Sequence, residues 1–310
     1  MIKNNSSVLH FIKSSNFANT YLNSPMTGDI SKSFLNLLND KSLINSFECE
    51  NDTPLGAGEY SFLVYGGQYL TLYNINGQLY RIPWNTNIYD SIKQIRWSSY
   101  YCSYLIMTAR YFSLFNFSTY ELLQIKKTFK SHEQLQFFTC HQIDLWLVCL
   151  LNLNKKQILV HYDLSEWEYR KSISLDKLGL YRTDTICAIE NNQNGQCLAL
   201  LIAERNQNIT VGIQRRRRLI LISTYTMSPI RVIYFSGADD LYWTITSVRN
   251  RQTSKNGWLL SKYFDNELTF IDNQCNYIKY KKELRNLAIT IDGHYLILRT
   301  INSLDIYQID

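Results

Sequence analysis

The residue types that usually carry catalysis or metal binding are present in this chain, but they do not form a known motif. The sequence contains no Gly-x-Ser-x-Gly elbow, no His-Glu-x-x-His pair and no phosphate-binding P-loop string. A zinc site needs ligands at close, defined intervals, and no pair of histidines has such a spacing. The five histidines are scattered along the chain, at His10, His132, His141, His161 and His294. We therefore expect no cofactor, no metal ion and no catalytic motif.

Two short segments resemble ligand-binding sequences, but each is explained more simply as a turn. Gly56-Ala-Gly58 lacks the third glycine of a dinucleotide fingerprint and precedes an expected strand, whereas that fingerprint opens a helix. We expect a flexible turn there. Asp239 and Asp240 are adjacent carboxylates that could bind a cation, but Asp is also favoured in turns for its own backbone contacts. We expect a turn there as well.

Basic residues form the one suggestive constellation. The net charge is only +6, from 32 basic and 26 acidic residues, so their placement matters more than their number. They recur where each structural unit is expected to turn from its second to its third strand. If the units align, these turns lie at one end and focus positive potential there. The residues of this candidate rim are Arg110, Lys155, Lys156, Arg205, Arg215, Arg216, Arg217, Arg218, Lys262 and Arg299.

The run Arg215–Arg218 is the strongest patch in this rim. We expect it to lie on an inserted hairpin and to project beyond the rim. Four arginines could contact the phosphate of a lipid headgroup, a nucleic acid or a phosphorylated partner. The alternative is that the rim is ordinary solvated charge, since polar hairpin turns often contain Lys or Arg.

The elements that must position these residues follow from a repeated strand phrase. Clear copies are Leu70–Ile75, Phe112–Phe117 and Leu304–Ile309, with weaker copies between them. The central apolar residues of the six copies are separated by 42, 45, 62, 49 and 36 residues. A period of about 40–50 residues is typical of a propeller, whose units bury their faces only by stacking on neighbours. These anchors are Leu72, Leu114, Leu159, Leu221, Phe270 and Ile306.

Each unit divides into four short strands joined by polar turns. The division is clearest over residues 92–125, 134–173 and 243–280. The 62-residue step is explained by an insertion, Glu204–Arg218, between a second and a third strand. The sequence therefore predicts an all-β chain, a β-propeller of six or seven four-stranded blades with an N-terminal arm.

The C-terminal segment Asp292–Asp310 resembles the second and third strands of a WD-repeat blade. In that family the third strand commonly ends in an aromatic residue followed by Asp, and Tyr162-Asp163 fits this pattern. The chain departs from the family in having no Trp-Asp dipeptide and no Gly-His opening. The resemblance covers residues 44–310, and it implies a propeller whose usual activity is partner binding.

Closure of the ring sets the domain boundaries. The last unit stops after its third strand, and a propeller avoids an open edge by taking a strand from the other terminus. Ser33–Leu38 could supply that strand, although a short helix is the alternative there. We assign 1–43 to an N-terminal arm or closing blade and 44–310 to the propeller. Seven blades with a split first blade are favoured over six.

Composition indicates the compartment. The 310 residues are 45% hydrophobic and 14% aromatic, which suits half-buried strands of one domain. The longest apolar run, Leu145–Leu151, is far shorter than the roughly 18 residues of a membrane span. Residues 1–30 carry no uninterrupted signal-peptide core. The seven cysteines form no CxxC pair, so we expect a reducing, intracellular environment, which is the cytoplasm.

We therefore expect a non-catalytic scaffold that holds protein partners, whose identity the sequence does not name. One alternative is binding of an anionic surface, either phosphoinositide or nucleic acid, through the basic rim. Another is an enzyme with a site in the central channel, which several titratable groups converging there would favour. No transmembrane segment is expected.

Overall fold

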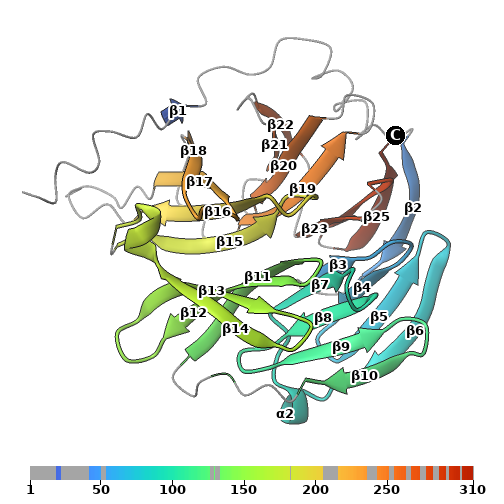
Figure 1. Ribbon diagram of the computed structural model, residues 1–310. Helices are drawn as coiled ribbons and strands as arrows, with labels where there is room; N and C mark the ends of the chain where they lie inside the picture. The colour runs from blue at the N-terminus through green and yellow to red at the C-terminus, as the bar shows by residue number, and fades with distance from the viewer. Residues whose placement is uncertain are drawn as a thin grey trace, which may run out of the picture.

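The chain forms a β-propeller of six four-stranded antiparallel blades arranged around a centre (Figure 1). This confirms the predicted fold class and decides for six blades over the favoured seven. The computed structural model describes the following residues: 19–21, 42–49, 54–125, 129, 133–181, 183–204, 216–235, 243–250, 255–262, 267–272, 277–281, 286–290, 293–300 and 302–309.

The strands of each blade follow one another outward from the centre, as a meander. Blade 1 contains β3 (Leu55–Ala57), β4 (Phe62–Tyr65), β5 (Tyr69–Asn74) and β6 (Gly77–Pro83). Blade 2 contains β7 (Gln94–Ser98), β8 (Ser103–Met107), β9 (Phe112–Asn116) and β10 (Glu121–Gln124). Blade 3 contains β11 (Glu133–His141), β12 (Asp144–Leu151), β13 (Lys156–Asp163) and β14 (Glu168–Ser174).

The second half of the ring repeats this order. Blade 4 contains β15 (Thr185–Asn191), β16 (Cys197–Glu204), β17 (Arg216–Ser223) and β18 (Pro229–Phe235). Blade 5 contains β19 (Trp243–Asn250), β20 (Lys255–Lys262), β21 (Glu267–Asp272) and β22 (Tyr277–Lys281). Blade 6 contains β23 (Asn286–Ile289), β24 (Tyr295–Arg299), β25 (Ser303–Gln308) and β2 (Leu43–Glu48). The strands predicted for blades 2, 3 and 5 are therefore confirmed.

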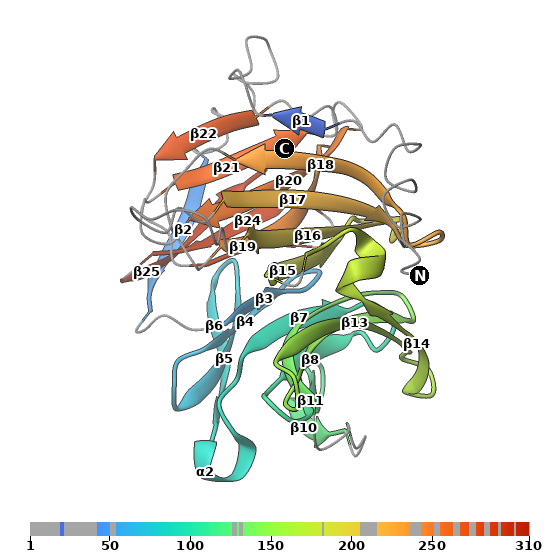
Figure 2. The same cartoon turned by 90° about the vertical axis from the view of Figure 1, so that its left-hand side faces the viewer.

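Three short elements lie outside this repeat. The strand β1 (Asn19–Tyr21) pairs in parallel with β18, so the sheet of blade 4 has five strands. Figure 2 shows these strands in order from β15 to β1. The helix α2 (Thr86–Tyr89) joins blades 1 and 2, and the 3-10 helix η1 (Leu175–Leu178) follows β14. Among the described helices, none is long and apolar enough to cross a membrane.

The meander gives the ring two distinct faces, because consecutive antiparallel strands turn at alternate ends. We count strands A to D outward from the centre. The turns from A to B and from C to D lie on one end, which we call the AB/CD face. The turns from B to C and the connections from D to the next A lie on the other end, the BC/DA face. The predicted basic rim belongs to the BC/DA face.

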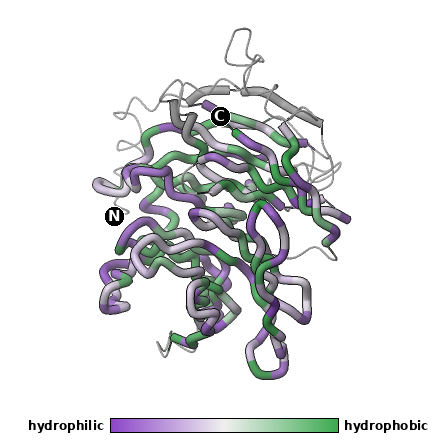
Figure 3. The backbone as a smooth tube through the Cα atoms, turned by 90° about the vertical axis from the view of Figure 1, so that its right-hand side faces the viewer, coloured by the Kyte–Doolittle hydropathy of each residue, from purple (hydrophilic) through white to green (hydrophobic). Residues whose placement is uncertain are grey.

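The core consists of six hydrophobic clusters, each formed between two successive blades. Figure 3 shows hydrophobic residues following the stacked strands. The six sequence anchors all lie on C strands, and each packs into the cluster shared with the following blade. Five of them are buried, whereas Leu114 is only half-buried. The periodic phrase thus marks the inter-blade packing surface.

The ring closes through β2, which pairs antiparallel with β25 from Leu43 opposite Tyr307 to Glu48 opposite Ser303. The prediction that the N-terminal part supplies the closing strand is correct, but the segment proposed for it is wrong. The strand lies at 43–48, and Ser33–Leu38 falls outside the described residues. Only Phe47 of β2 packs into a core cluster, so the segment lacks the apolar alternation that marks the other strands.

Candidate binding site in the central channel

A cavity of about 350 Å³ opens at the centre of the AB/CD face. Its wall is built by the A strands of all six blades near their C-terminal ends, together with A-to-B turn residues of blades 2, 3 and 4. The first strands converge at the centre of a propeller, so residues far apart in sequence meet there. Small-molecule sites commonly measure about 300–1,000 Å³, and this cavity is at the lower end of that range.

An ion pair crosses the channel beneath this cavity. Nη2 of Arg96, on β7, lies 2.7 Å from Oε2 of Glu190, on β15, and their side chains are 19% and 13% exposed. The same Arg96 nitrogen also lies 3.4 Å from the carbonyl oxygen of Ile245, on β19. One side chain of blade 2 therefore contacts blades 4 and 5.

Burial is the largest influence on the pKa of Glu190. Loss of hydration disfavours the carboxylate and raises the pKa of Glu190 from 4.5 to about 7, although Arg96 acts in the opposite direction. This outcome is physically reasonable because one hydrogen-bonded cation seldom replaces the full hydration of a buried carboxylate. The charge of the channel pair therefore changes near neutral pH.

Asn191 follows Glu190 in β15 and is the best-defined recognition group in the cavity wall. Its backbone N–H donates to Oγ1 of Thr139 at 3.1 Å, which holds the end of β15 against β11. The residue is only 4% exposed. In the described part of the chain, neither Nδ2 nor Oδ1 of its side chain has a hydrogen-bond partner. Buried amides are normally paired, so this one is available to a ligand.

Cys140 and His141 add two titratable groups to the same wall. The Cys140 thiol donates to the carbonyl oxygen of Trp97 at 3.3 Å, and burial raises the pKa of Cys140 to about 12. Burial also lowers the pKa of His141, against the opposing effect of Asp144. Titratable groups do converge here, which is the feature that would favour an enzyme. The thiol is held protonated and Glu190 is held by Arg96, so the arrangement suits binding better than nucleophilic chemistry.

Ala57 of the segment Gly56-Ala-Gly58 lines this cavity, and the segment is not the flexible turn that the sequence suggests. Gly56 lies inside β3, and an added Cβ there would be 2.6 Å from Cγ2 of Ile95. At Gly58 the added Cβ would be 2.8 Å from Cε3 of Trp97 and 2.9 Å from the Tyr104 hydroxyl. Glycine is needed because the inner strands of blades 1 and 2 approach too closely for a side chain.

Exposed apolar side chains lie in turns of the AB/CD face on four successive blades. They lie in the A-to-B turns of blades 1, 2 and 3 and in the C-to-D turns of blades 2 and 4. Tyr225 is 92% exposed and Tyr60 is 73% exposed. The ring of Tyr120 stacks on Tyr80 of β6, with 4.3 Å between centroids. We call this set the apolar rim: Tyr60, Tyr100, Tyr120, Ile143 and Tyr225.

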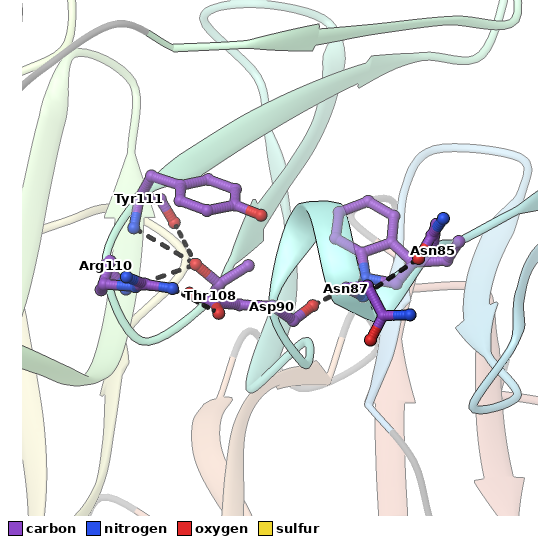
Figure 4. A network of polar contacts seen from close by, with 7 residues as sticks. Asn85, Asn87, Asp90, Thr108, Arg110 and Tyr111 are labelled. Carbon is purple, nitrogen blue, oxygen red and sulfur yellow. Dashed lines mark hydrogen bonds and ion pairs between the residues drawn. The ribbon is translucent and has the colours of Figure 1, made fainter.

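The BC/DA face keeps only part of the predicted basic rim. Lys155 and Lys156 are exposed there and border a groove of about 820 Å³ between blades 3 and 4. Arg110 is also exposed, but its Nε and Nη2 donate to Asp90 at 2.8 and 2.7 Å. Figure 4 shows this pair beside Thr108 and Tyr111. Arg110 lowers the pKa of Asp90, and the Asp90 carboxylate in turn offsets the positive charge of Arg110.

Three predicted rim arginines are buried, which corrects their assignment. Arg217 and Arg218 are 2% and 5% exposed, and Arg299 is fully buried. The strand β17 begins at Arg216, so the predicted insertion ends earlier than Arg218 and these residues pair with β16 and β18. Arg299 ends β24, where its Nη1 lies 3.4 Å from the Tyr65 carbonyl oxygen.

Arg218 is neutralised by two carboxylates inside the fold. Its Nη2 lies 2.5 Å from Oδ2 of Asp184, and its Nη1 lies 2.6 Å from Oε1 of Glu204. Asp184 also accepts from the backbone N–H of Tyr181 at 2.8 Å. The arginine run therefore does not project from the molecule at this position.

The remaining rim residues leave the anion-binding prediction untested. Arg216 and Lys262 mark the start of β17 and the end of β20. Arg205 and Arg215 lie outside the described residues, as do Asp239 and Asp240. Sequence reasoning missed the channel residues Arg96, Glu190 and Asn191 because inner-strand positions carry no motif. The only available signal was a charged or amide residue interrupting an apolar strand.

No known protein-family model matches this chain. No curated protein matches it either. Among solved structures, a chain from "Crystal Structure of Mitotic Checkpoint Complex" has 8% identity, a TM-score of 0.56 and coverage of 92% of this chain and 97% of that chain.

Two auxiliary nutrient binding proteins also share the fold. The one from Bacteroides thetaiotaomicron has 9% identity, a TM-score of 0.58 and coverage of 85% of this chain and 70% of that chain. The one from Bacteroides ovatus has 8% identity, a TM-score of 0.58 and coverage of 84% and 69%. At such low identity these likenesses establish the fold alone. The chain is thus a six-bladed β-propeller.

Proposed function

We propose that this protein is a non-catalytic scaffold that binds a protein partner through its AB/CD face. The observation that carries the proposal is the apolar rim, which places four exposed tyrosines and one isoleucine on four successive blades. Tyrosine is enriched among the residues that dominate binding energy at protein interfaces. Exposed apolar residues on one face of a fold can mark an interaction surface, and the aromatic members of this set lie on the AB/CD face.

The scaffold suits this role because its turns are held by stacked sheets. Tyr80 supports Tyr120 by ring stacking, so at least one rim residue is already ordered before binding. A side chain that is ordered in the free protein loses less conformational entropy when a partner binds. The similar chain from the mitotic checkpoint complex structure belongs to a protein assembly, which is compatible with a scaffold role here.

Two finer inferences accompany this proposal. We infer an intracellular, cytoplasmic location, supported by the six described cysteines, which form no disulfide with one another. We also keep anion binding as a second candidate, now centred on Lys155 and Lys156 because they border the BC/DA groove. Asp176 and Asp184 line the same groove and oppose an anion, so this candidate ranks below partner binding.

The test compares matched triple substitutions on the two faces. One variant carries Tyr60→Ser, Tyr100→Ser and Tyr225→Ser on the AB/CD face. The control carries Ile88→Ser, Leu153→Ser and Tyr181→Ser, which are exposed apolar residues on the BC/DA face. A partner is first identified by affinity purification of the wild-type chain. Its dissociation constant is then measured with each purified variant.

We expect the AB/CD variant to weaken the identified complex by at least about tenfold, because each truncated hot-spot residue costs more than about 1 kcal/mol. The control should bind like the wild type, and both variants should keep the wild-type melting temperature within a few degrees. Equal affinity of the AB/CD variant and the wild type, with loss in the control, would place the interface on the other face and overturn the proposal.

A further inference from the structure

The wall of the channel cavity contains several buried polar atoms that have no hydrogen-bond partner among the described residues. Within the described residues, Nδ2 and Oδ1 of Asn191, Nε of Arg96 and Nε1 of Trp97 are buried without hydrogen-bond partners. All three residues line the same cavity. A buried polar atom without a partner costs about 1–3 kcal/mol, so four in one cavity indicate that a molecule entering from outside completes them.

These groups are fixed in place before any ligand arrives. The backbone of Asn191 is tied to Thr139, and the neighbouring Glu190 holds the guanidinium of Arg96. Supporting contacts of this kind pre-organise a site, so binding does not have to order the side chains.

The charge of the wall favours a neutral ligand. Arg96 and Glu190 lie 2.7 Å apart and offset one another above about pH 7, where Glu190 is ionised. Besides Oε2 of Glu190, which faces Arg96, the unpaired groups of Arg96, Trp97 and Asn191 are three N–H donors and the Asn191 carbonyl oxygen. A side-chain amide offers a donor beside an acceptor, and a second amide can match both at once. Additional carbonyl oxygens on the ligand would accept from the other two donors.

We propose that this cavity binds a small neutral molecule through a carboxamide edge, a carbonyl oxygen beside an N–H group. The ligand carbonyl accepts from Nδ2 of Asn191, and the ligand N–H donates to Oδ1. The same chemistry could come from a free small amide or from the glutamine side chain of a partner. The residues that line the cavity are distinct from those of the apolar rim, so the site can be tested with small amides without a protein partner.

The experiment uses the purified full chain and three neutral probes, benzamide, nicotinamide and N-methylacetamide. Binding is measured by calorimetry and ligand-observed NMR, against benzoate, nicotinate and acetate as acid counterparts. A blocked tripeptide with a central glutamine is compared with the same peptide carrying methionine. Asn191→Leu removes both amide atoms at similar volume, and Asn302→Leu is the matched control in an exposed turn of the BC/DA face.

We expect at least one neutral amide to bind, with affinity at least about tenfold above its acid counterpart. Asn191→Leu should abolish that binding, whereas Asn302→Leu should retain it. The bound amide should raise the melting temperature of the wild type and of Asn302→Leu only. If Asn191→Leu does not fold, Asn191→Ala gives the same comparison with no added bulk.

The remaining outcomes decide the source of the amide or overturn the proposal. Binding of the glutamine peptide alone, lost in Asn191→Leu, supports the chemistry and assigns it to a partner side chain. Equal binding of amides and acids, or equal binding by wild type and Asn191→Leu, contradicts the assigned contact. If neither an amide probe nor the glutamine peptide binds, the proposal is overturned and water is the occupant of the cavity. None of these results depends on whether the apolar rim binds a protein.

Discussion

Arg96 and Arg218 are both buried and both pair with carboxylates, yet they sit in different electrostatic settings. Each terminal nitrogen of Arg218 has its own carboxylate, Asp184 for one and Glu204 for the other. Arg96 has only Glu190, and both residues line the channel cavity. Among the described residues, Nε of each arginine lacks a hydrogen-bond partner, so the number of carboxylates and the cavity are what distinguish the two settings. One cluster is closed by the fold, and the other is left open to the channel.

This difference teaches that burial alone does not identify a functional charge. The Arg218 cluster lies where β17 begins, and its groups hold the junction of blades 3 and 4 together. The Arg96 pair lies where six inner strands converge and where neighbouring polar atoms are also unpaired. We expect the closed cluster to determine stability and the open pair to determine binding and pH response.

Breaking the closed cluster should have the largest effect on stability. Arg218→Met removes the cation and leaves Asp184 and Glu204 as neighbouring carboxylates without it. Removing one partner of a buried ion pair typically costs about 3–5 kcal/mol, so the free energy of unfolding should fall by about that amount. Urea denaturation of the purified variant measures the loss.

The exposed pair on the BC/DA face provides the control for that prediction. Arg110→Met breaks the contact with Asp90, but Arg110 has a side chain that is 76% exposed. Surface ion pairs contribute about 0–1 kcal/mol, so this variant should stay close to the wild type. Losses of similar size in both variants would contradict the distinction between closed and exposed pairs.

The open pair should give a smaller, pH-dependent effect on stability. The pKa of Glu190 rises from 4.5 when unfolded to about 7 when folded. The folded state therefore binds more protons between these values, and stability should fall as pH rises through this window. At about 1.4 kcal/mol per pKa unit, the contribution lost by pH 8 is about 3 kcal/mol.

Glu190→Gln should remove this contribution, since glutamine does not titrate. Unfolding is measured by urea between pH 4.5 and 8 in both proteins, and the difference between the two curves isolates Glu190. His141 acts in the opposite direction, because burial lowers the pKa of His141 and its deprotonation favours folding as pH rises. It is present in both proteins and cancels. Parallel curves would show that the pKa of Glu190 is not raised.

The smallest effect is expected on the BC/DA face. Lys155→Ser with Lys156→Ser should leave stability within about 0.5 kcal/mol, as usual for exposed substitutions. Weak binding of inositol hexakisphosphate should be reduced in this variant and should vanish as salt rises, since exposed charges are screened within about 8–10 Å at physiological ionic strength. Calorimetry at low and physiological salt tests both points. Unchanged binding in the variant would remove the anion-binding candidate.

The periodic features were predictable because they arise from packing between blades. Leu72, Leu159 and Ile306 occupy equivalent positions on C strands, each against the following blade. A repeat that must bury the same face in every unit keeps an apolar residue at the same point of each unit, and one sequence shows this as a period. Leu114 occupies the equivalent C-strand position of blade 2 but is only partly buried.

The errors arose where neighbouring elements decide the environment. Arg217 and Arg218 read as a solvated hairpin, but β17 extends into the expected insertion and buries both. The closing strand β2 shows little apolar alternation, since mainly Phe47 packs inward. Gly56 reads as a turn residue, yet it lies in a strand that blade 2 approaches closely. None of these facts is visible from local composition.

The sequence by itself determined the all-β class, the propeller repeat and the strand boundaries of several blades, because hydrophobic periodicity is a local consequence of burial between successive units. Only the tertiary structure decided the six-blade closure, the burial of the arginines and the meeting of Arg96, Glu190 and Asn191 in one cavity. Arg96 lies on blade 2, whereas Glu190 and Asn191 lie two blades later, on blade 4. Their proximity depends on the curvature of the whole sheet array, which no single segment encodes.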